Sequence, residues 1–101
     1  MAKIETSEEA IQSILNTDKI VILLKEIGME VVRQEAKWGR WADCHHGYAI
    51  ILEELDEVWD EIKKNDTKLS VEEMKQVATC ALRYILRFGE EYKDAEIQKK
   101  K

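Results

Sequence analysis

Apolar side chains recur at intervals of three and four residues along four segments of the chain, which predicts four helices. These segments run over residues 7–15, 18–37, 43 or 45 to 64, and 71–88. Proline is absent and glycine occurs only four times, a composition that suits helices joined by short connections. The pattern therefore predicts an all-α fold, a four-helix antiparallel bundle or part of one, in a single domain over residues 1–101. A domain of this size buries less than about 70% of its unfolded surface, so we expect further copies of the chain to complete the bundle.

Local signals place the ends of these helices. Capping-box spacing joins Thr6 to Glu9 at the start of the first helix and Ser70 to Glu73 at the start of the fourth. Gly39 is a natural C-cap for the second helix. The stretch 65–67, Asn-Asp-Thr, predicts a turn between the third and fourth helices.

The second and third helices each have an apolar stripe. The stripe of the second comprises Ile20, Leu24, Ile27, Val31 and Trp38. Gly28 lies within that helix and marks either a close helix contact or a kink. The stripe of the third spans about 120° and is expected to face the core; it comprises Tyr48, Ile51, Leu52, Leu55, Val58, Trp59 and Ile62.

The opposite face of the third helix is strongly acidic. Six of the nine residues in 53–61 are carboxylates, and all six lie outside the apolar stripe. The chain has a formal charge of −5 and this segment alone contributes −6, so the acidity is local. Asp60 and Glu61 have lysines within three or four residues, whereas Glu53, Glu54 and Glu57 have none.

An uncompensated group of carboxylates at positions i, i+1 and i+4 of one helix suits part of a site for a hard divalent cation. One helix presents ligands from one side only, so a second helix must complete the site. The fourth helix is the best candidate, because Glu73 and Gln76 lie on its narrow polar strip with Arg83 and Arg87. The alternative is that the acidic face is solvated surface.

Other features of the composition narrow the class of protein. No segment approaches the roughly 20 apolar residues of a membrane span, and the N-terminus lacks the apolar region of a signal peptide. The two cysteines indicate no disulfide framework, so we expect a cytoplasmic protein. The negative charge, with a basic run only at 99–101, argues against nucleic acid as a partner. Cys44, His45 and His46 match no zinc framework, and a capping or packing role is expected for the histidines.

Residues 53–57, Glu-Glu-Leu-Asp-Glu, fit the EExxE motif of the MazG-like all-alpha nucleoside triphosphate pyrophosphatase superfamily, which includes the dimeric dUTPases. The chain also resembles small phage and bacterial members over the stretches 33–39, 45–49 and 76–84, so the likeness covers about residues 33–88. The family follows EExxE with ExxD on the next helix. Here that position reads Glu73-Met74-Lys75-Gln76, with an amide in place of the last carboxylate.

The resemblance implies hydrolysis of a (d)NTP to a (d)NMP and pyrophosphate, with Mg²⁺ or Mn²⁺ as cofactor, in a homodimer or homotetramer. It implies that the metal ligands are Glu53, Glu54, Glu57 and Glu73, with a weaker contribution from Gln76. A carboxylate not fully engaged by metal, Glu53 or Glu57, is expected to accept the proton of the attacking water.

Four further residues are expected to bind the nucleotide. Lys37, Arg83 and Arg87 are candidates for stabilising phosphate charge, and Trp38 or Trp41 for stacking on a base. Each of these residues has a structural alternative, as a salt-bridge partner or a core side chain. The competing functional class is a non-catalytic helical interaction module, or a degenerate MazG-like protein that binds metal or nucleotide without turnover.

Overall fold

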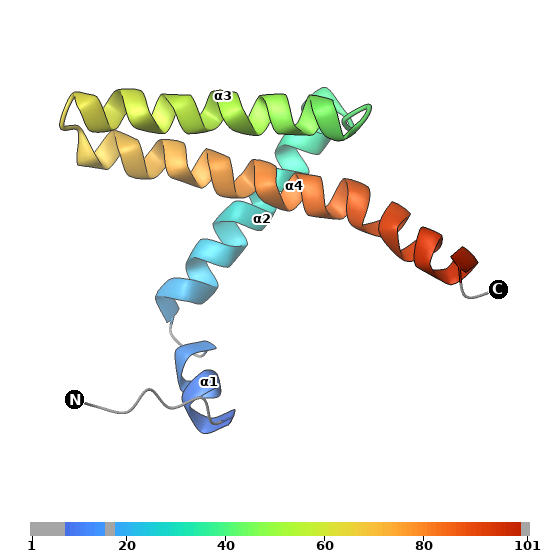
Figure 1. The fold of residues 1–101 in the computed structure, drawn as a ribbon. Helices are drawn as coiled ribbons and strands as arrows, with labels where there is room; N and C mark the ends of the chain where they lie inside the picture. The colour runs from blue at the N-terminus through green and yellow to red at the C-terminus, as the bar shows by residue number, and fades with distance from the viewer. Residues whose placement is uncertain (1–7, 16–17, 100–101) are drawn as a thin grey trace.

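The computed structural model of the chain describes residues 8–15 and 18–99 (Figure 1). Within these ranges the chain forms α1 (Glu8–Leu15), α2 (Asp18–Trp38), α3 (Cys44–Lys63) and α4 (Thr67–Lys99). The prediction of an all-α fold is confirmed, and the second and third helices end within one residue of their expected C-termini. The fourth helix is longer than predicted at both ends.

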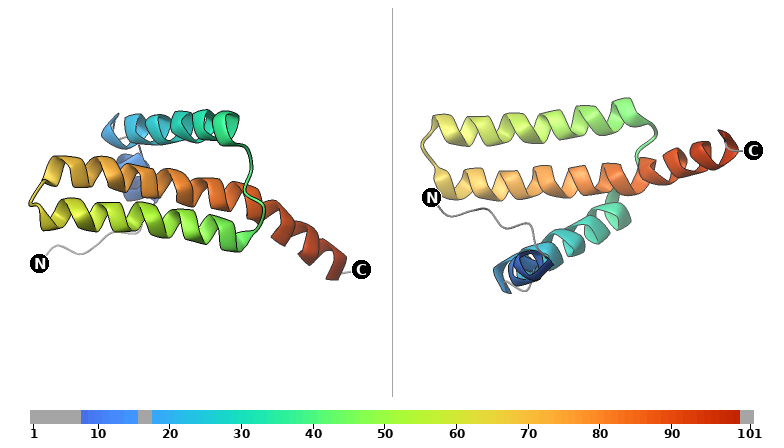
Figure 2. Two further views of the ribbon diagram at one scale, coloured as in Figure 1. Left: turned by 90° about the horizontal axis from the view of Figure 1, so that it is seen from above. Right: turned by 60° about the horizontal axis from the view of Figure 1, so that its bottom comes forward.

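The helix α4 lies between α2 and α3 and packs against both (Figure 2). The α3 and α4 helices run antiparallel as a long hairpin, and α2 crosses α4 at an angle on the other side (Figure 1). The tight turn between α3 and α4 uses Asn65 at φ 59°, in the left-handed region that asparagine tolerates. None of the helices in the described ranges is long and apolar enough to cross a membrane.

Aspartates cap the N-termini of both hairpin helices. Asp43 accepts a hydrogen bond from the His46 backbone N–H at 2.9 Å, and Asp66 accepts one from the Leu69 N–H at 3.0 Å. Gly39 ends α2 at φ +76°, as its predicted C-cap role requires. The loop from 39 to 43 therefore joins two capped helix ends, the C-terminus of α2 and the N-terminus of α3.

The predicted cap at Ser70 is wrong. The α4 helix starts one turn earlier because Asp66 supplies the cap, and the Ser70 hydroxyl donates to the Thr67 carbonyl within the first turn. The corresponding prediction for Thr6 lies outside the described residues. Of the two alternatives for Gly28, the close helix contact is not found within the described ranges, since a Cβ there would meet no atom within 4 Å.

A small core lies where the loop after α2 meets the α3–α4 hairpin. Trp41, Cys80 and Phe88 form its buried centre, and Ile50, Ile51 and Tyr84 pack against it. Gly47 is required at this point, because a Cβ there would lie 2.7 Å from the Trp41 ring. The core therefore fixes the loop and the start of α3 against α4.

Most of the expected core stripe of α3 faces solvent. Val58 is buried, whereas five other members of the stripe are 46–57% exposed: Tyr48, Leu52, Leu55, Trp59 and Ile62. Leu24 and Trp38, from the predicted stripe of α2, are likewise exposed. The physical reason is that α4 covers only one side of α3, and the described part of the chain supplies no other helix for the remaining side.

Candidate metal centre

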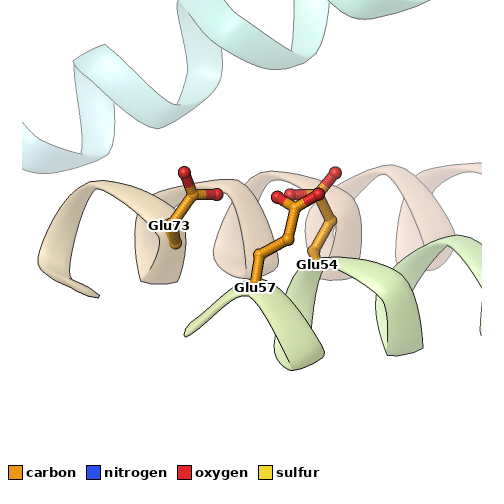
Figure 3. A group of neighbouring side chains, drawn as sticks. All are labelled: Glu54, Glu57 and Glu73. Carbon is orange, nitrogen blue, oxygen red and sulfur yellow. The ribbon is translucent and has the colours of Figure 1, made fainter. Parts of the chain in front are cut away.

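Three glutamates from two helices converge on one side of the α3–α4 hairpin (Figure 3). Glu54 and Glu57 come from α3 and Glu73 from α4, and a carboxylate oxygen of each lies within 4.8 Å of the others. The tight turn at 64–66 brings this about, because it returns α4 alongside α3 with Glu73 opposite the EExxE segment. The expected pairing of the acidic helix with Glu73 is thus present in the fold.

The cluster is electrostatically uncompensated. Burial raises the pKa of Glu54, and the nearby charges of Glu57 and Glu73 raise it further. A hydrogen bond shared with Glu57 raises the pKa of Glu73, together with partial burial and the charge of Glu57. No ion pair among the described residues involves these three glutamates, whereas Asp60 and Glu61 pair with Lys63 and Lys64 as expected.

The donor set fits a hard divalent cation. Three carboxylates within reach of one point supply oxygen ligands, which Mg²⁺ and Mn²⁺ prefer, and leave positions for waters and phosphate oxygens. A cation there would also relieve the repulsion that raises the pKa of Glu54. Glu53 lies outside the group of three, so the cluster is smaller than the ligand set that the resemblance implies.

A cavity of about 440 Å³ opens beside the cluster. It is lined by Gln34, Trp38, Trp41, His46, Ile50, Glu53, Glu54, Gln76, Cys80 and Arg83. Six candidate site residues from the sequence meet here: Trp38, Trp41, Glu53, Glu54, Gln76 and Arg83. Glu54 belongs to both the cluster and the cavity wall, so a ligand in the cavity would lie next to a bound cation.

A larger cavity, of about 530 Å³, lies between α2 and α4. Its charges are largely paired, since Lys75 bridges to Glu26 at 3.6 Å and to Glu72 at 3.5 Å. It is also lined by none of the three clustered glutamates. We therefore place the candidate site at the smaller cavity.

Arg83 is buried, and each of its three side-chain nitrogens donates to a neighbour. Its Nε donates to Glu35 at 3.1 Å, Nη1 to the Gln34 side-chain oxygen at 3.1 Å, and Nη2 to the Gly39 carbonyl at 2.9 Å. Its guanidinium also lies 4.5 Å from the centre of the Trp41 ring. The residue lines the cavity, but its contacts are those of a structural hub that ties α2 and the following loop to α4.

The other two predicted phosphate-binding cations do not line the cavity. Lys37 lies over the exposed Trp38 ring, with Nζ 4.8 Å from its centre. Arg87 donates from Nε to the Trp41 carbonyl at 2.9 Å, so it helps to hold the loop. Of the predicted nucleotide-binding residues, Trp38 and Arg83 therefore lie together and Lys37 and Arg87 lie apart from them.

Sequence reasoning missed Gln34, which lies buried in the cavity wall. A signal was present, because Gln34 follows Val31 by three residues and Ile27 by seven, so it is a polar side chain on an apolar stripe. His46 also lines the cavity, and its Nδ1 accepts the Ala42 N–H at 3.4 Å beside the Asp43 cap. His46 also lies against the Trp41 ring, with 6.3 Å between the ring centres, so the expected capping or packing role stays a prediction.

No protein-family model, curated protein or solved structure matches this chain. What the fold and the site define is an all-helical chain with a carboxylate cluster between two helices and an aromatic-lined cavity beside it. The resemblance to the MazG-like superfamily stays a prediction that rests on the motifs themselves.

Proposed function

We propose that this protein is a metal-dependent nucleotide pyrophosphohydrolase that cleaves a (d)NTP to a (d)NMP and pyrophosphate, in a house-cleaning or nucleotide-pool role. One observation carries the proposal: three uncompensated carboxylates from two helices lie beside a cavity with two tryptophans in its wall. The cluster suits a cation that binds phosphates, and the cavity suits the nucleoside. The EExxE segment and Glu73 support the same activity through the MazG-like resemblance.

Three of the glutamates would bind the metal, and a fourth would act as the general base. Glu54, Glu57 and Glu73 would hold the cation, which would supply positive charge to neutralise the phosphates and lower the pKa of a nearby water. Glu53 lines the cavity without belonging to the cluster, so it is the better placed of the two candidate bases to accept the proton of the attacking water. The water attacks the α-phosphorus, and pyrophosphate leaves.

No protein nucleophile takes part in this scheme. Burial raises the pKa of the Cys80 thiol, which disfavours its reactive thiolate form. Cys44 is exposed, and both cysteines are free thiols, as suits the reducing cytoplasm in which we place the protein. Direct attack by water is the simplest chemistry for a site whose reactive groups are carboxylates.

The test is release of pyrophosphate from a nucleotide panel with Mg²⁺ or Mn²⁺. Glu73→Gln removes one of the three clustered carboxylates and should lower turnover at least a hundredfold, about 2.7 kcal/mol in transition-state stabilisation. Glu72→Gln is the matched control, because Glu72 is the preceding residue and points to Lys75 instead. Equal turnover in the two variants would place the chemistry elsewhere.

A second candidate is a non-catalytic helical interaction module, in which the acidic face of α3 binds a basic partner. It predicts no pyrophosphate from any nucleotide, no Mg²⁺ binding by calorimetry, and salt-sensitive binding to a basic protein. A degenerate relative would instead bind Mg²⁺ and nucleotide without turnover. The same assays therefore separate all three functions.

We propose that a second copy of this chain covers the exposed stripe, in a homodimer or in a homotetramer built from such dimers. Its five members are spaced by four, three, four and three residues, the spacing of a coiled-coil seam. Together they expose on the order of 500 Å², a large part of the roughly 800 Å² that each partner buries in a standard interface. The radius of gyration of 17.3 Å, against about 13 Å for a compact domain of this length, supports association.

Matched lysine substitutions test this interface. Leu55→Lys places a charge in the stripe and should yield monomers in sedimentation analysis at micromolar concentration. Asp60→Lys places the same side chain on the far side of α3, where it breaks only an exposed ion pair, and should leave the oligomer intact. A wild-type monomer at these concentrations would contradict the assignment.

A further inference from the structure

A chain of hydrogen bonds that begins at Arg83 orients two side-chain amides, that of the buried Gln34 and that of the half-buried Gln76. Arg83 carries donors only, so the atom of Gln34 that it contacts at 3.1 Å must be the side-chain oxygen. The Nε2 of Gln34 then donates to Gln76 Oε1 at 2.8 Å and to Glu30 Oε1 at 3.1 Å. The arginine thereby fixes which end of each amide is nitrogen.

With the side-chain oxygen of Gln76 facing Gln34, the side-chain nitrogen of Gln76 can donate to a ligand. Its oxygen is occupied by Gln34, while Nε2 has no hydrogen-bond partner among the described residues. The atom is not enclosed either, since no buried side-chain nitrogen or oxygen in the described part of the chain lacks a partner. Gln76 lines both the candidate cavity and the larger cavity between α2 and α4, and we assign its two N–H donors to the candidate cavity, where the exposed Trp38 ring lies.

The cavity around this amide suits a neutral ring better than a phosphate. The basic side chain in its wall is Arg83, whose three nitrogens already donate to Glu35, Gln34 and Gly39. Glu53 and Glu54 would repel an anion that is not bound to metal. Trp38 offers exposed aromatic surface, which favours a flat base, whereas Trp41 lines the wall from the core and is only 5% exposed.

We propose that Gln76 Nε2 donates a hydrogen bond to a carbonyl oxygen of the nucleobase, so that the site prefers a keto base to its amino counterpart. This inference rests on the proposed function and names its substrate class. A keto oxygen accepts the N–H, whereas an exocyclic amino group at the same position would set donor against donor. Gln76 is then a specificity-determining residue and not a metal ligand, because the oxygen that would face a cation is engaged by Gln34.

Two ligand pairs test the proposal: the non-hydrolysable triphosphates of uridine and cytidine, and those of inosine and adenosine. The members of each pair differ in a keto or amino group at one ring position. With Mg²⁺ present, the keto member of at least one pair should bind the wild-type protein about tenfold more tightly in calorimetry. Gln76→Met should remove that preference and leave Mg²⁺ affinity unchanged.

Gln34→Glu gives the sharper result. The carboxylate introduced by this substitution would accept from both Arg83 and Gln76, so the Gln76 amide should turn and present its oxygen to the cavity. The base preference should then reverse toward the amino member. Glu30→Gln is the control, because its side-chain oxygen still accepts from Gln34 and the preference should persist. If burial of the new carboxylate prevents Gln34→Glu from folding, the Gln76→Met comparison still decides the matter.

Each outcome has one meaning. Equal binding of both pairs to the wild-type protein overturns the inference, as does a Gln76→Met variant that loses Mg²⁺ affinity and keeps its base preference. If pyrophosphate is released without regard to keto or amino groups, the inference fails and the proposed function stands. If no nucleotide binds or turns over, the proposed function fails and the inference falls with it.

Discussion

Two polar clusters lie about the same cavity and differ in how their charge is balanced. Arg83 is 3% exposed, yet Glu35, Gln34 and a backbone carbonyl satisfy its guanidinium. The cluster of Glu54, Glu57 and Glu73 gathers like charges with no cation among the described residues. A buried charge with all its partners holds a fold together, whereas a group of like charges without a counterion costs free energy until a cation binds. The difference separates a structural centre from a candidate binding site.

The largest expected effect is on the structural centre. Arg83→Met leaves the carboxylate of Glu35 and the oxygen of Gln34 without their donor, and should lower the free energy of unfolding by about 3–5 kcal/mol. Urea denaturation measures the loss. Arg33→Met is the control, because Arg33 is an exposed arginine paired with Glu30 on the same helix, and it should cost under about 1 kcal/mol. If both variants lost a similar free energy of unfolding, Arg83 would be no more important to the fold than an exposed arginine.

The next effect concerns Mg²⁺ and pH at the acidic cluster. Mg²⁺ at about 100 times its dissociation constant should stabilise the wild-type protein by about 2.7 kcal/mol and leave Glu54→Gln nearly unchanged. Since folding raises the pKa of Glu54 and Glu73, protons compete with the metal at a higher pH than at an ordinary glutamate. Calorimetric titrations at falling pH should therefore show affinity declining through that raised pKa. An affinity that is independent of pH down to the ordinary pKa of glutamate would contradict this.

The smallest effect is on the metal-free protein. A raised pKa means that these two carboxyl groups favour the fold when protonated, and this contribution is lost as pH rises through the raised pKa. At neutral pH, Glu73→Gln should thus stabilise the metal-free protein by about 0.2–0.5 kcal/mol, as removal of one like-charged contact does. Glu72→Gln removes a favourable contact with Lys75 and should not stabilise. Thermal melts in a chelator compare the two, and destabilisation by Glu73→Gln would be the contrary result.

The helices and the acidic pairing could be predicted because they depend on local spacing. Glu54 and Glu57 lie on one face by helix geometry, and the turn after Lys63 brings Glu73 opposite them. The exposure of the apolar stripe of α3 could not be predicted from the sequence. The stripe spans about 120° and has the same pattern whether a helix of this chain or a helix of another copy covers it. The α4 start was misplaced since Asp66 and Ser70 both resemble N-caps in sequence.

The long-range polar contacts were also beyond local reasoning. Arg83 pairs with residues 44 to 49 positions away, and no spacing rule distinguishes such a hub from a phosphate-binding arginine. The direction of the Gln76 amide depends on the same contacts, through Gln34. Side chains whose role is set by partners on another helix became interpretable only with the fold.

We propose that the acidic cluster binds a divalent cation beside a nucleotide cavity. The most direct test is a crystal structure grown with Mn²⁺ and a non-hydrolysable nucleoside triphosphate, with the metal located by anomalous diffraction. The expected result is a Mn²⁺ peak at coordination distance, about 2.1 Å as for Mg²⁺, from oxygens of Glu54, Glu57 and Glu73, with the triphosphate on its open side. A nucleotide bound elsewhere, or a cluster without a peak at saturating Mn²⁺, would contradict it.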